Sequence, residues 1–469
     1  MIYSNNLNKN IFFTETNSIL LDYLKQTYNY DLSPLTYSRK YTNGTYTITR
    51  PSTKYKGCKF VNGYPHFDVP YDVMLKEINN FIDKEPLYNK DIIIRYGDTH
   101  LYNPIPKLNQ VRNLVIADIF DSMILTSGEK HIVYTIGDID RKSLNKVAEK
   151  FNENEIEDII KKLNNFIVTG NECDTYYLKE WKNLDLEATK KLNLLLKKLN
   201  LKRDKFLLES DLYRNKSIYN SIKDNVMYEN GIRDDGTLKY PLQELMFLLT
   251  VNRENTSIIS VIGDNQVEHV LKVMKILNNN NMDLDASFLT YSICRNGDSR
   301  EIEDWSKKID AYIKKENIAI DGELIKYQDY LKIIIGGQGN SRTIDYEDLG
   351  RYKQNFERFK VIYESKKMSY DKRNKNAQSG EKTDLLSNMA LGNYYLNLAV
   401  KSGEQSKFFT YLYNISKEYM KSIDENEKNN DLYYNFISEG LQRLNLNDIG
   451  KYKMREVKKK DDISEELER

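Results

Sequence analysis

Two residues in the second half of the chain have types and spacing that could bind a small ligand. Tyr240 and Glu244 are four residues apart in DDGTLKYPLQELMFLL, a stretch with helical periodicity, so their side chains share one helix face. A carboxylate on such a face suits a planar, fork-shaped cation. The same spacing also fits a core tyrosine beside a surface charge, and the pattern alone leaves both interpretations open.

A second candidate lies in LYNPIPKLNQVRNLVIADIF, residues 101–120, which follows the apolar run DIIIRYG and opens a periodic helix. A strand, a turn and a helix start with polar groups are typical of nucleotide sites, because helix N-terminal N–H groups favour phosphate. Lys107 and Gln110 could contact an anion there, but the turn contains no glycine. A plain strand-to-helix connection with a solvated Lys107 is the alternative.

The elements that must position these residues are those of an α/β domain. Apolar runs predict strands at 91–96, 131–138, 256–264 and 286–295, and a helix is expected from 107 to 126. Strands that alternate with helices through short connections predict a parallel sheet. The Gly-rich segment 333–343 lacks the lysine and spacing of a P-loop, so we expect a loop.

The domain organisation follows from changes of pattern along the chain. Residues 1–88 mix helical and strand patterns and predict a small α+β domain, and 89–344 form the α/β domain. Within it, 141–205 are helical and highly charged, which indicates an insertion with a solvated face. Residues 345–455 show a helical pattern throughout, and 456–469 form a charged tail.

Composition excludes several classes of protein. The 469 residues carry a net charge of +1, so no global field indicates a nucleic-acid binder, although a local basic groove remains compatible. The three cysteines are far apart, the four histidines are scattered, and no metal-ligand spacing occurs, so no metal site is expected. No signal peptide or membrane span is expected, and we predict a cytoplasmic protein, with a monomer favoured.

From about residue 90 to 450 the chain resembles class I aminoacyl-tRNA synthetases, specifically arginyl-tRNA synthetase, through several segments in the correct order. NPIPKLNQVRNLVIADIF is similar to the first signature region, and YTIGDIDR to the strand and turn after it. DDGTLKYPLQE looks like the family's Asp-Gly-Thr segment with its Tyr-x-x-x-Asp helix, and SIISVIGDNQVEHVLKVMKIL like the next strand, Gly-x-Asp-Gln turn and helix. Two C-terminal helices, FFTYLYNISKEYMKSI and LYYNFISEGLQRLNLNDI, resemble the anticodon-binding domain.

This resemblance implies a Rossmann-like catalytic domain with a helical insertion, an all-α anticodon-binding-like C-terminal domain and a small α+β N-terminal domain. It also implies an amino-acid pocket that holds the guanidinium and α-amino groups of arginine. The pocket residues carried over by the resemblance are Asp98, Asn103, Tyr240, Glu244 and Gln266.

The sequence departs from the family at the nucleotide half of the site. The family has two histidines and a glycine at the helix start, and this chain has Lys107, Asn109 and Gln110. The resemblance assigns all three to ATP with Mg²⁺, and Lys107 and Gln110 to catalysis. Asn109 is the least compatible, because its side chain occupies the space that glycine leaves for adenine. Losing one preorganised donor typically costs about 10²–10³ in rate.

The second signature, a Lys-Met-Ser-Lys loop, is also absent from its expected place. NGDSREIEDW follows the strand ASFLTYSICR, with Arg295 and Arg300 as its bases. A literal KKMS occurs at 366–369, but it lies after the expected helix YEDLGRYKQNFERF, within the C-terminal helical domain, and this position makes it a decoy. Lys107 or Lys90 could replace the missing lysine. Arg295 and Asp264 complete the expected nucleotide contacts, and an alternative role for Asp264, as for Asp138, is to bind nearby backbone N–H groups.

Two functions of different classes are compatible with these residues. The first is ATP-dependent activation of arginine or a related amino acid and its transfer to tRNA. The second is a non-catalytic synthetase paralogue that binds an amino acid or tRNA. The C-terminal aromatics could stack on unpaired tRNA bases, but the spacing of Phe409, Leu412, Ile415 and Tyr419 fits a helix core better.

Overall fold

The computed structural model describes most of the chain. The described residues are 2–4, 17–31, 35–37, 45–52, 54–100, 107–151, 155–171, 173–226, 231–234, 236–295, 302–372, 384–421 and 429–449, and at 37, 97–99, 225, 302 and 303 only the backbone is described. Every structural statement below refers to these residues.

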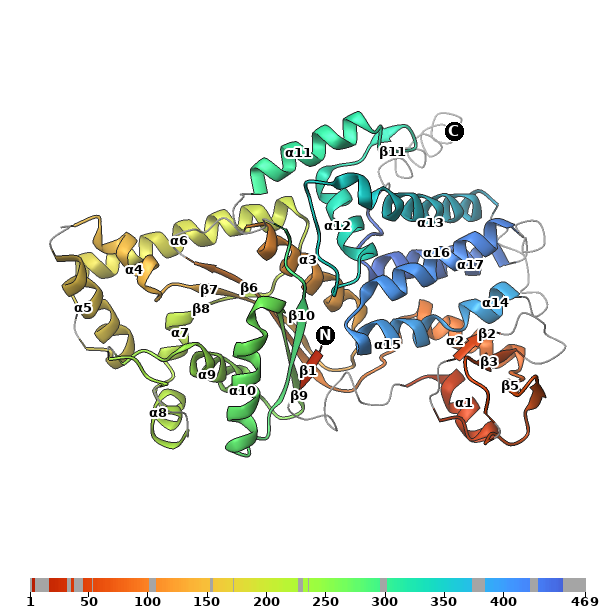
Figure 1. The fold of residues 1–469 in the computed structure, drawn as a ribbon, viewed down its shortest axis with the longest axis horizontal. Helices are drawn as coiled ribbons and strands as arrows, with labels where there is room; N and C mark the ends of the chain where they lie inside the picture. Colours follow the sequence, from red (N-terminus) through yellow and green to blue (C-terminus); the bar gives the residue numbers. More distant parts are fainter. Residues whose placement is uncertain are drawn as a thin grey trace, which may run out of the picture.

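A six-stranded sheet forms the centre of the α/β part (Figure 1). Its order is β1 (Ile2–Ser4), β10 (Asp285–Tyr291), β9 (Thr256–Gly263), β6 (Asp91–His100), β7 (Lys130–Gly137) and β8 (Lys205–Leu208). The five strands from β10 to β8 are parallel, and only β1 at the edge is antiparallel. Every residue of β9 and β10 is buried, as expected for strands covered on both faces. The predicted parallel sheet is confirmed.

Helices follow the strands in the order that the sequence pattern predicts. β6 leads to α3 (Leu108–Met123), whose residues are almost all buried. β8 leads to α7 (Glu209–Tyr213), α8 (Lys216–Asn225) and α9 (Tyr240–Val251), and β9 leads to the short η3 (Asp264–Gln266) and α10 (Val267–Asn279). The charged insertion forms α4 (Arg141–Ala148), α5 (Ile156–Thr169) and α6 (Thr175–Lys198) at one end of the molecule (Figure 1).

The N-terminal part forms its own antiparallel sheet. Its order is β2 (Leu35–Tyr37), β3 (Tyr46–Ile48), β5 (Tyr64–Phe67) and β4 (Lys59–Val61), beside α1 (Ile19–Tyr28) and α2 (Tyr71–Ile82). The first strand, β1, departs from our division of the chain, because it pairs with β10 of the central sheet instead of with this small sheet. Residues 2–4 therefore form an edge strand of the central sheet and cover the side of β10.

From residue 302 onward the described chain is mainly helical. The helices are α11 (Ile302–Lys315), α12 (Tyr327–Gly337), η4 (Leu349–Tyr352), α13 (Lys353–Asp371), α14 (Asp384–Met389), α15 (Gly392–Ser402), α16 (Gln405–Lys421) and α17 (Asn430–Arg443), with the small hairpin β11 (Ala319–Ile320) and β12 (Glu323–Leu324) after α11. The prediction of a loop at 333–343 is wrong for residues 333–337, because α12 continues through Gly336 and ends at Gly337. The apolar packing of Ile333, Ile334 and Ile335 outweighs the low helix propensity of glycine.

Aromatic side chains form the core of the C-terminal helices. Phe409, Leu412, Ile415 and Tyr419 are all fully buried, so the core interpretation is confirmed for these four. Tyr419 stacks on Tyr433 with ring centroids 3.9 Å apart. Bases cannot reach these rings without unfolding the bundle.

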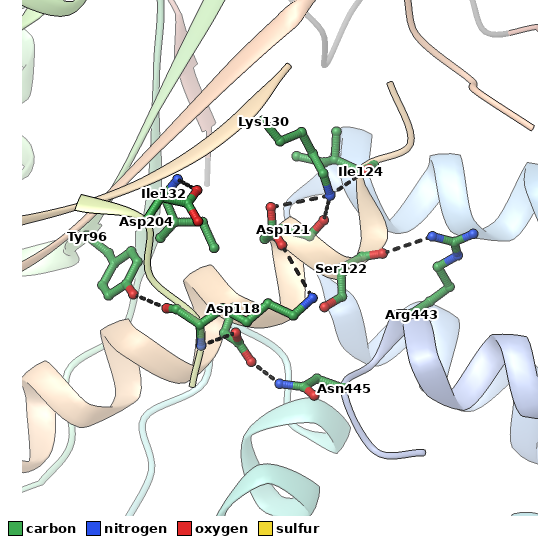
Figure 2. Close-up of polar contacts among 11 residues, drawn as sticks. Tyr96, Asp118, Asp121, Ser122, Ile124, Lys130, Ile132, Asp204, Arg443 and Asn445 are labelled. Atoms are coloured by element: carbon green, nitrogen blue, oxygen red, sulfur yellow. Dashed lines mark hydrogen bonds and ion pairs between the residues drawn. The ribbon is translucent and has the colours of Figure 1, made fainter. Parts of the chain in front are cut away.

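Helix α3 also joins the two large parts of the molecule (Figure 2). Asn445, just after α17, donates from Nδ2 to the carboxylate of Asp118 on α3. Arg443 donates to the carbonyl oxygen of Ser122 at 3.3 Å, and the backbone N–H of Lys202 donates to Asp118 at 3.1 Å. The C-terminal half of α3 is thus fixed by groups from both the insertion and the helical part.

Among the described residues, no helix combines the length and hydropathy needed to cross a membrane.

Candidate functional site

A small, tight pocket, with room for about one water molecule, lies beside β6, β7 and β8, under helices α7 and α9. Two of the predicted residues, Tyr240 and Glu244, line it together, because their i, i+4 spacing places them on the face of α9 that covers the sheet. The other lining residues are Arg95, Thr135, Leu207, Leu208, Glu209, Leu212, Gln243 and Phe247. The structure therefore brings two of the five predicted amino-acid residues together around one small pocket.

The carboxylate of Glu244 is already paired inside the chain. Arg95 of β6 forms an ion pair with Glu244 through Nη1 and Oε2, and Ser260 donates to Oε1 at 3.4 Å. Side-chain exposure is 1% for Glu244 and 13% for Arg95, so this charge pair is largely removed from water. The surface-charge alternative for Glu244 is wrong, because the side chain is buried.

Arg95 is held by two further contacts. Its Nε donates to Thr135 Oγ1 at 3.3 Å, and its guanidinium carbon lies 4.5 Å from the centroid of the Phe247 ring. A guanidinium that faces an aromatic ring and a carboxylate at once is well oriented. Arg95 was not among the residues predicted from the sequence. The feature that could have indicated it is a single basic residue inside the apolar strand run DIIIRYG.

The remaining predicted pocket residues are placed differently. Gln266 is half-buried in η3 and does not belong to the residues that line the described cavity. Asp98 lies in β6, where only its backbone is described, and Asn103 lies outside the described residues. Tyr240 packs its ring 4.9 Å from that of His269, which is exposed at the start of α10. His269 therefore contacts a residue of the pocket but does not itself line the pocket.

At the start of α3, two of the three predicted nucleotide residues use their side chains within the fold. Gln110 accepts a hydrogen bond through Oε1 from the backbone N–H of Lys107 at 2.7 Å, so it caps its own helix. Asn109 is 7% exposed and accepts through Oδ1 from the backbone N–H of Cys294 at 2.6 Å. Its carbonyl oxygen accepts from the Tyr291 hydroxyl at 3.0 Å. Asn109 therefore fastens the helix start to the end of β10.

The other basic and acidic candidates also have partners in the chain. Arg295 pairs with Asp345 at 3.2 Å, and Asp264 accepts from the backbone N–H of Ile293 at 3.3 Å. Lys90 pairs with Asp285 at 2.8 Å, and both lie at the amino ends of their strands. The pocket residues Leu207 and Leu208 lie at the carboxyl end of β8, so Lys90 lies at the opposite edge of the sheet.

The KKMS tetrapeptide lies in the C-terminal helical part, as predicted, but inside α13 and not after it, because this helix continues to Asp371. Lys366 is buried at 4% exposure and donates to Asn447 Oδ1 at 2.8 Å. Ser369 is fully buried and donates to the carbonyl oxygen of Lys366 at 2.7 Å. Both side chains support the helical bundle.

Two carboxyl groups, of which Asp138 is fully buried and Asp185 half-buried, lie where the insertion meets the sheet. Asp138, at the end of β7, accepts from the backbone N–H of Ser210 at 2.9 Å, and burial raises its pKa to about 7. Burial, followed by the nearby charges of Asp138 and Asp211, raises the pKa of Asp185 on α6 to about 8. The structural alternative for Asp138, in which it binds backbone N–H groups, agrees with the Ser210 contact. Among the described residues, no group of three His, Cys, Asp or Glu side chains could hold a metal ion.

Comparison with known proteins identifies the fold. No family model and no curated protein matches the sequence. Among solved structures, the Plasmodium falciparum arginyl-tRNA synthetase superposes with a TM-score of 0.65 at 13% identity, covering 91% of this chain and 96% of that one. The Thermus thermophilus arginyl-tRNA synthetase gives 0.52 at 12% identity, covering 87% and 95%.

A Campylobacter jejuni protein described as a candidate arginyl-tRNA synthetase gives a TM-score of 0.54 at 14% identity, covering 80% of this chain and 97% of that one. All three matches extend over most of both chains, so they include the sheet and most of the surrounding helices. The protein therefore has the fold of a class I synthetase of the arginyl-tRNA synthetase type.

Proposed function

We propose that this protein is a non-catalytic relative of the arginyl-tRNA synthetases that binds tRNA and does not activate arginine. The observation that carries the proposal is the start of α3, where Asn109 and Gln110 make their side-chain hydrogen bonds within the chain. The fold is shared with proteins named as arginyl-tRNA synthetases, and the site that would hold ATP differs.

The residues at this helix start do not fit ATP held as the resemblance implies. A phosphate at a helix N-terminus needs donors that point outward from the first turn. Gln110 instead offers its oxygen to the N–H of Lys107, and the Asn109 side chain fills the space beside the end of β10. Losing one preorganised donor costs about 10²–10³ in rate, so losing two removes useful activation.

The tRNA part of the proposal depends on the fold and on one aromatic side chain. Tyr413 of α16 is half-buried, and two cations lie over its ring, Arg358 at 5.6 Å and Lys417 at 5.4 Å from the centroid. An accessible aromatic between cations suits unpaired bases and their phosphates. The fully buried rings of the same helix cannot take that role.

A second candidate function is activation of a different amino acid through altered contacts. The observation in its favour is that Tyr240 and Glu244, two residues of the predicted amino-acid set, still line one small pocket.

The test is AMP formation from ATP with total tRNA present, using arginine first and then each other amino acid. We expect no amino-acid-dependent AMP, together with retention of labelled tRNA in a gel-shift assay. The Tyr413→Ala variant should bind tRNA more weakly, while Tyr433→Phe, a change in the buried core, serves as the matched control. AMP formation that depends on arginine would refute the proposal, and AMP formation with another amino acid would establish the second candidate.

A further inference from the structure

We propose that the acidic segment 461–469 of this chain docks on a basic face of helix α6, in a contact within one molecule that needs neither tRNA nor an amino acid. The basic face of α6 consists of exposed side chains along the second half of the helix, which are Leu186, Lys190, Lys191, Leu194, Lys197 and Lys198. Residues 461–469 lie outside the described residues, so we use only their sequence.

Large apolar side chains are exposed between the lysines of this face. Leu186 and Leu194 are 55% and 69% exposed, and their spacing with Lys190 and Lys197 places all four along one stripe of the helix. The other face of α6 is buried in the protein through Trp181, Leu184, Ala188, Leu192 and Leu196. A helix that exposes leucines among lysines favours an acidic partner that also carries apolar residues.

The helix dipole accounts for only part of the positive charge on this face. Lys197 and Lys198 lie in the last turn of α6, where cations stabilise the helix, but the other two lysines precede that turn. Glu187 pairs with Lys191 at 2.6 Å, and the chain from 188 to 203 contains six basic residues and no acid. The basic face therefore keeps a net positive charge that an anionic segment would neutralise.

The described part of the chain stops close to the end of α6. Asn445 donates to Oδ2 of Asp118 (Figure 2), and the backbone N–H of Lys202 donates to Oδ1 of the same carboxylate at 3.1 Å. Lys202 follows the end of α6 at Lys198 by only four positions. The C-terminal segment therefore starts beside the helix on which we propose that it docks.

The distance between the two is short enough for the connecting residues to span. Twelve positions separate Ile449, the last described residue, from Asp461, and such a stretch reaches at most about 40 Å when extended. The basic face, from Leu186 to Lys198, is about 18 Å long at the rise of an α-helix. All of the basic face thus lies within reach of the acidic segment.

The composition of the acidic segment complements the basic face. Its sequence, DDISEELER, contains five acids and one arginine, which gives a net charge of −4. Ile463 and Leu467 lie between the acids and supply apolar side chains to cover Leu186 and Leu194, whose burial from water is favourable. The segment thus carries both kinds of group that the basic face requires of a partner.

The experiment is disulfide cross-linking in the full-length chain, in a background with Cys58→Ser and Cys173→Ser. Leu194→Cys/Leu467→Cys places one thiol on the basic face and one in the acidic segment. Non-reducing electrophoresis and mass spectrometry then measure how fast the disulfide forms within one molecule. Leu186→Cys/Leu467→Cys repeats the measurement at the second exposed leucine.

The matched control is Leu324→Cys/Leu467→Cys. Leu324 is 44% exposed and also lies near the end of the described chain, because the adjacent residues Lys366 and Lys367 bind Asn447 and Asp321, respectively. We expect the Leu194→Cys pair to cross-link at least about tenfold faster than this control pair. Salt at about 0.5 M should remove most of the difference, because it screens exposed charges.

A charge swap tests the electrostatic part of the contact. Lys190→Glu/Lys197→Glu, added to the Leu194→Cys pair, should slow cross-linking to the control rate, and further addition of Glu465→Lys/Glu466→Lys should restore it. Equal rates for the Leu194→Cys and Leu324→Cys pairs would overturn the proposal, since the segment would then contact any surface within reach. Cross-links that form only between two copies of the chain, or a swap that restores nothing, would overturn it as well.

Discussion

Asn445 and Asp118 are 327 residues apart in the chain, yet Asn445 donates a hydrogen bond to the Asp118 carboxylate in the interior (Figure 2). Asp118 lies on α3, whose first turn contains the candidate nucleotide residues. Burial raises the pKa of Asp118, so each donor to its carboxylate contributes to keeping the charge inside the fold. The contact therefore links the helical part to the helix that begins at the site.

Removing the Asn445 side chain should destabilise the protein. Asn445 has a φ of 55°, a left-handed conformation that favours glycine, so Asn445→Gly removes the donor without adding backbone strain. We expect a loss of about 1–3 kcal/mol in the free energy of unfolding, because a buried carboxylate loses a partner. Urea denaturation measures this change, and exposed Gln442→Ala is the control. An unchanged midpoint would show that the contact contributes nothing.

The ion pair between Arg95 and Glu244 should show strong thermodynamic coupling. Arg95→Ala alone is expected to lower stability by about 3–5 kcal/mol, because it leaves Glu244 as an unpaired buried charge. Arg95→Ala/Glu244→Gln should be less destabilised than the sum of the two single variants. A double-mutant cycle in urea gives the coupling energy. Additive losses would mean that the two side chains act independently.

Asn109 should prove structural in a test that separates stability from nucleotide binding. Asn109→Ala leaves the backbone N–H of Cys294 without its acceptor, so we expect a loss of about 1–3 kcal/mol in unfolding free energy. The neighbouring Lys107→Ala should change stability by less than about 0.5 kcal/mol. Thermal melts with and without ATP measure both effects. A stabilisation by ATP in the wild type that Asn109→Ala removes would instead assign Asn109 to the nucleotide.

The raised pKa of Asp185 predicts how the stability of the protein depends on pH. The pKa of Asp185 lies at about 8 in the folded protein against an ordinary 3.8, so the folded state holds the proton more tightly than the unfolded state. Stability from this group is therefore present below pH 4 and is lost as pH rises toward about 8. Burial raises the pKa of Asp185 most, the charges of Asp138 and Asp211 raise it further, and Arg214 opposes them.

Asp185→Asn should flatten this pH dependence and stabilise the protein at pH 8 by roughly 1–3 kcal/mol. Denaturation curves at several pH values between 4 and 8 measure it. Glu187→Gln on the same helix is the control, since Glu187 is exposed and pairs with Lys191 on the surface. Equal pH profiles for the wild type and Asp185→Asn would contradict the assignment of the raised pKa to this group.

The strands and the main helices could be predicted because their patterns are local. The apolar runs at 91–96 and 256–264 correspond to β6 and β9, and both are buried in a parallel sheet. The buried stripe of Phe409, Leu412, Ile415 and Tyr419 follows from helical spacing alone. The pairing of β1 with β10 could not be predicted, because it joins residues 2–4 to residues 287–289, which are far apart in the sequence.

The i, i+4 spacing of Tyr240 and Glu244 is enough to predict that they share a helix face, because the helical period sets this relationship. The partner of Glu244 could be found only from the folded chain, since Arg95 lies 149 residues away. The same holds for Asn109, whose side chain meets the backbone of Cys294 instead of pointing outward. Residue types and spacing specify which groups are available within an element. The register and packing of separate elements decide which of those groups meet, and hence whether a carboxylate remains available to a ligand or is neutralised by the chain itself.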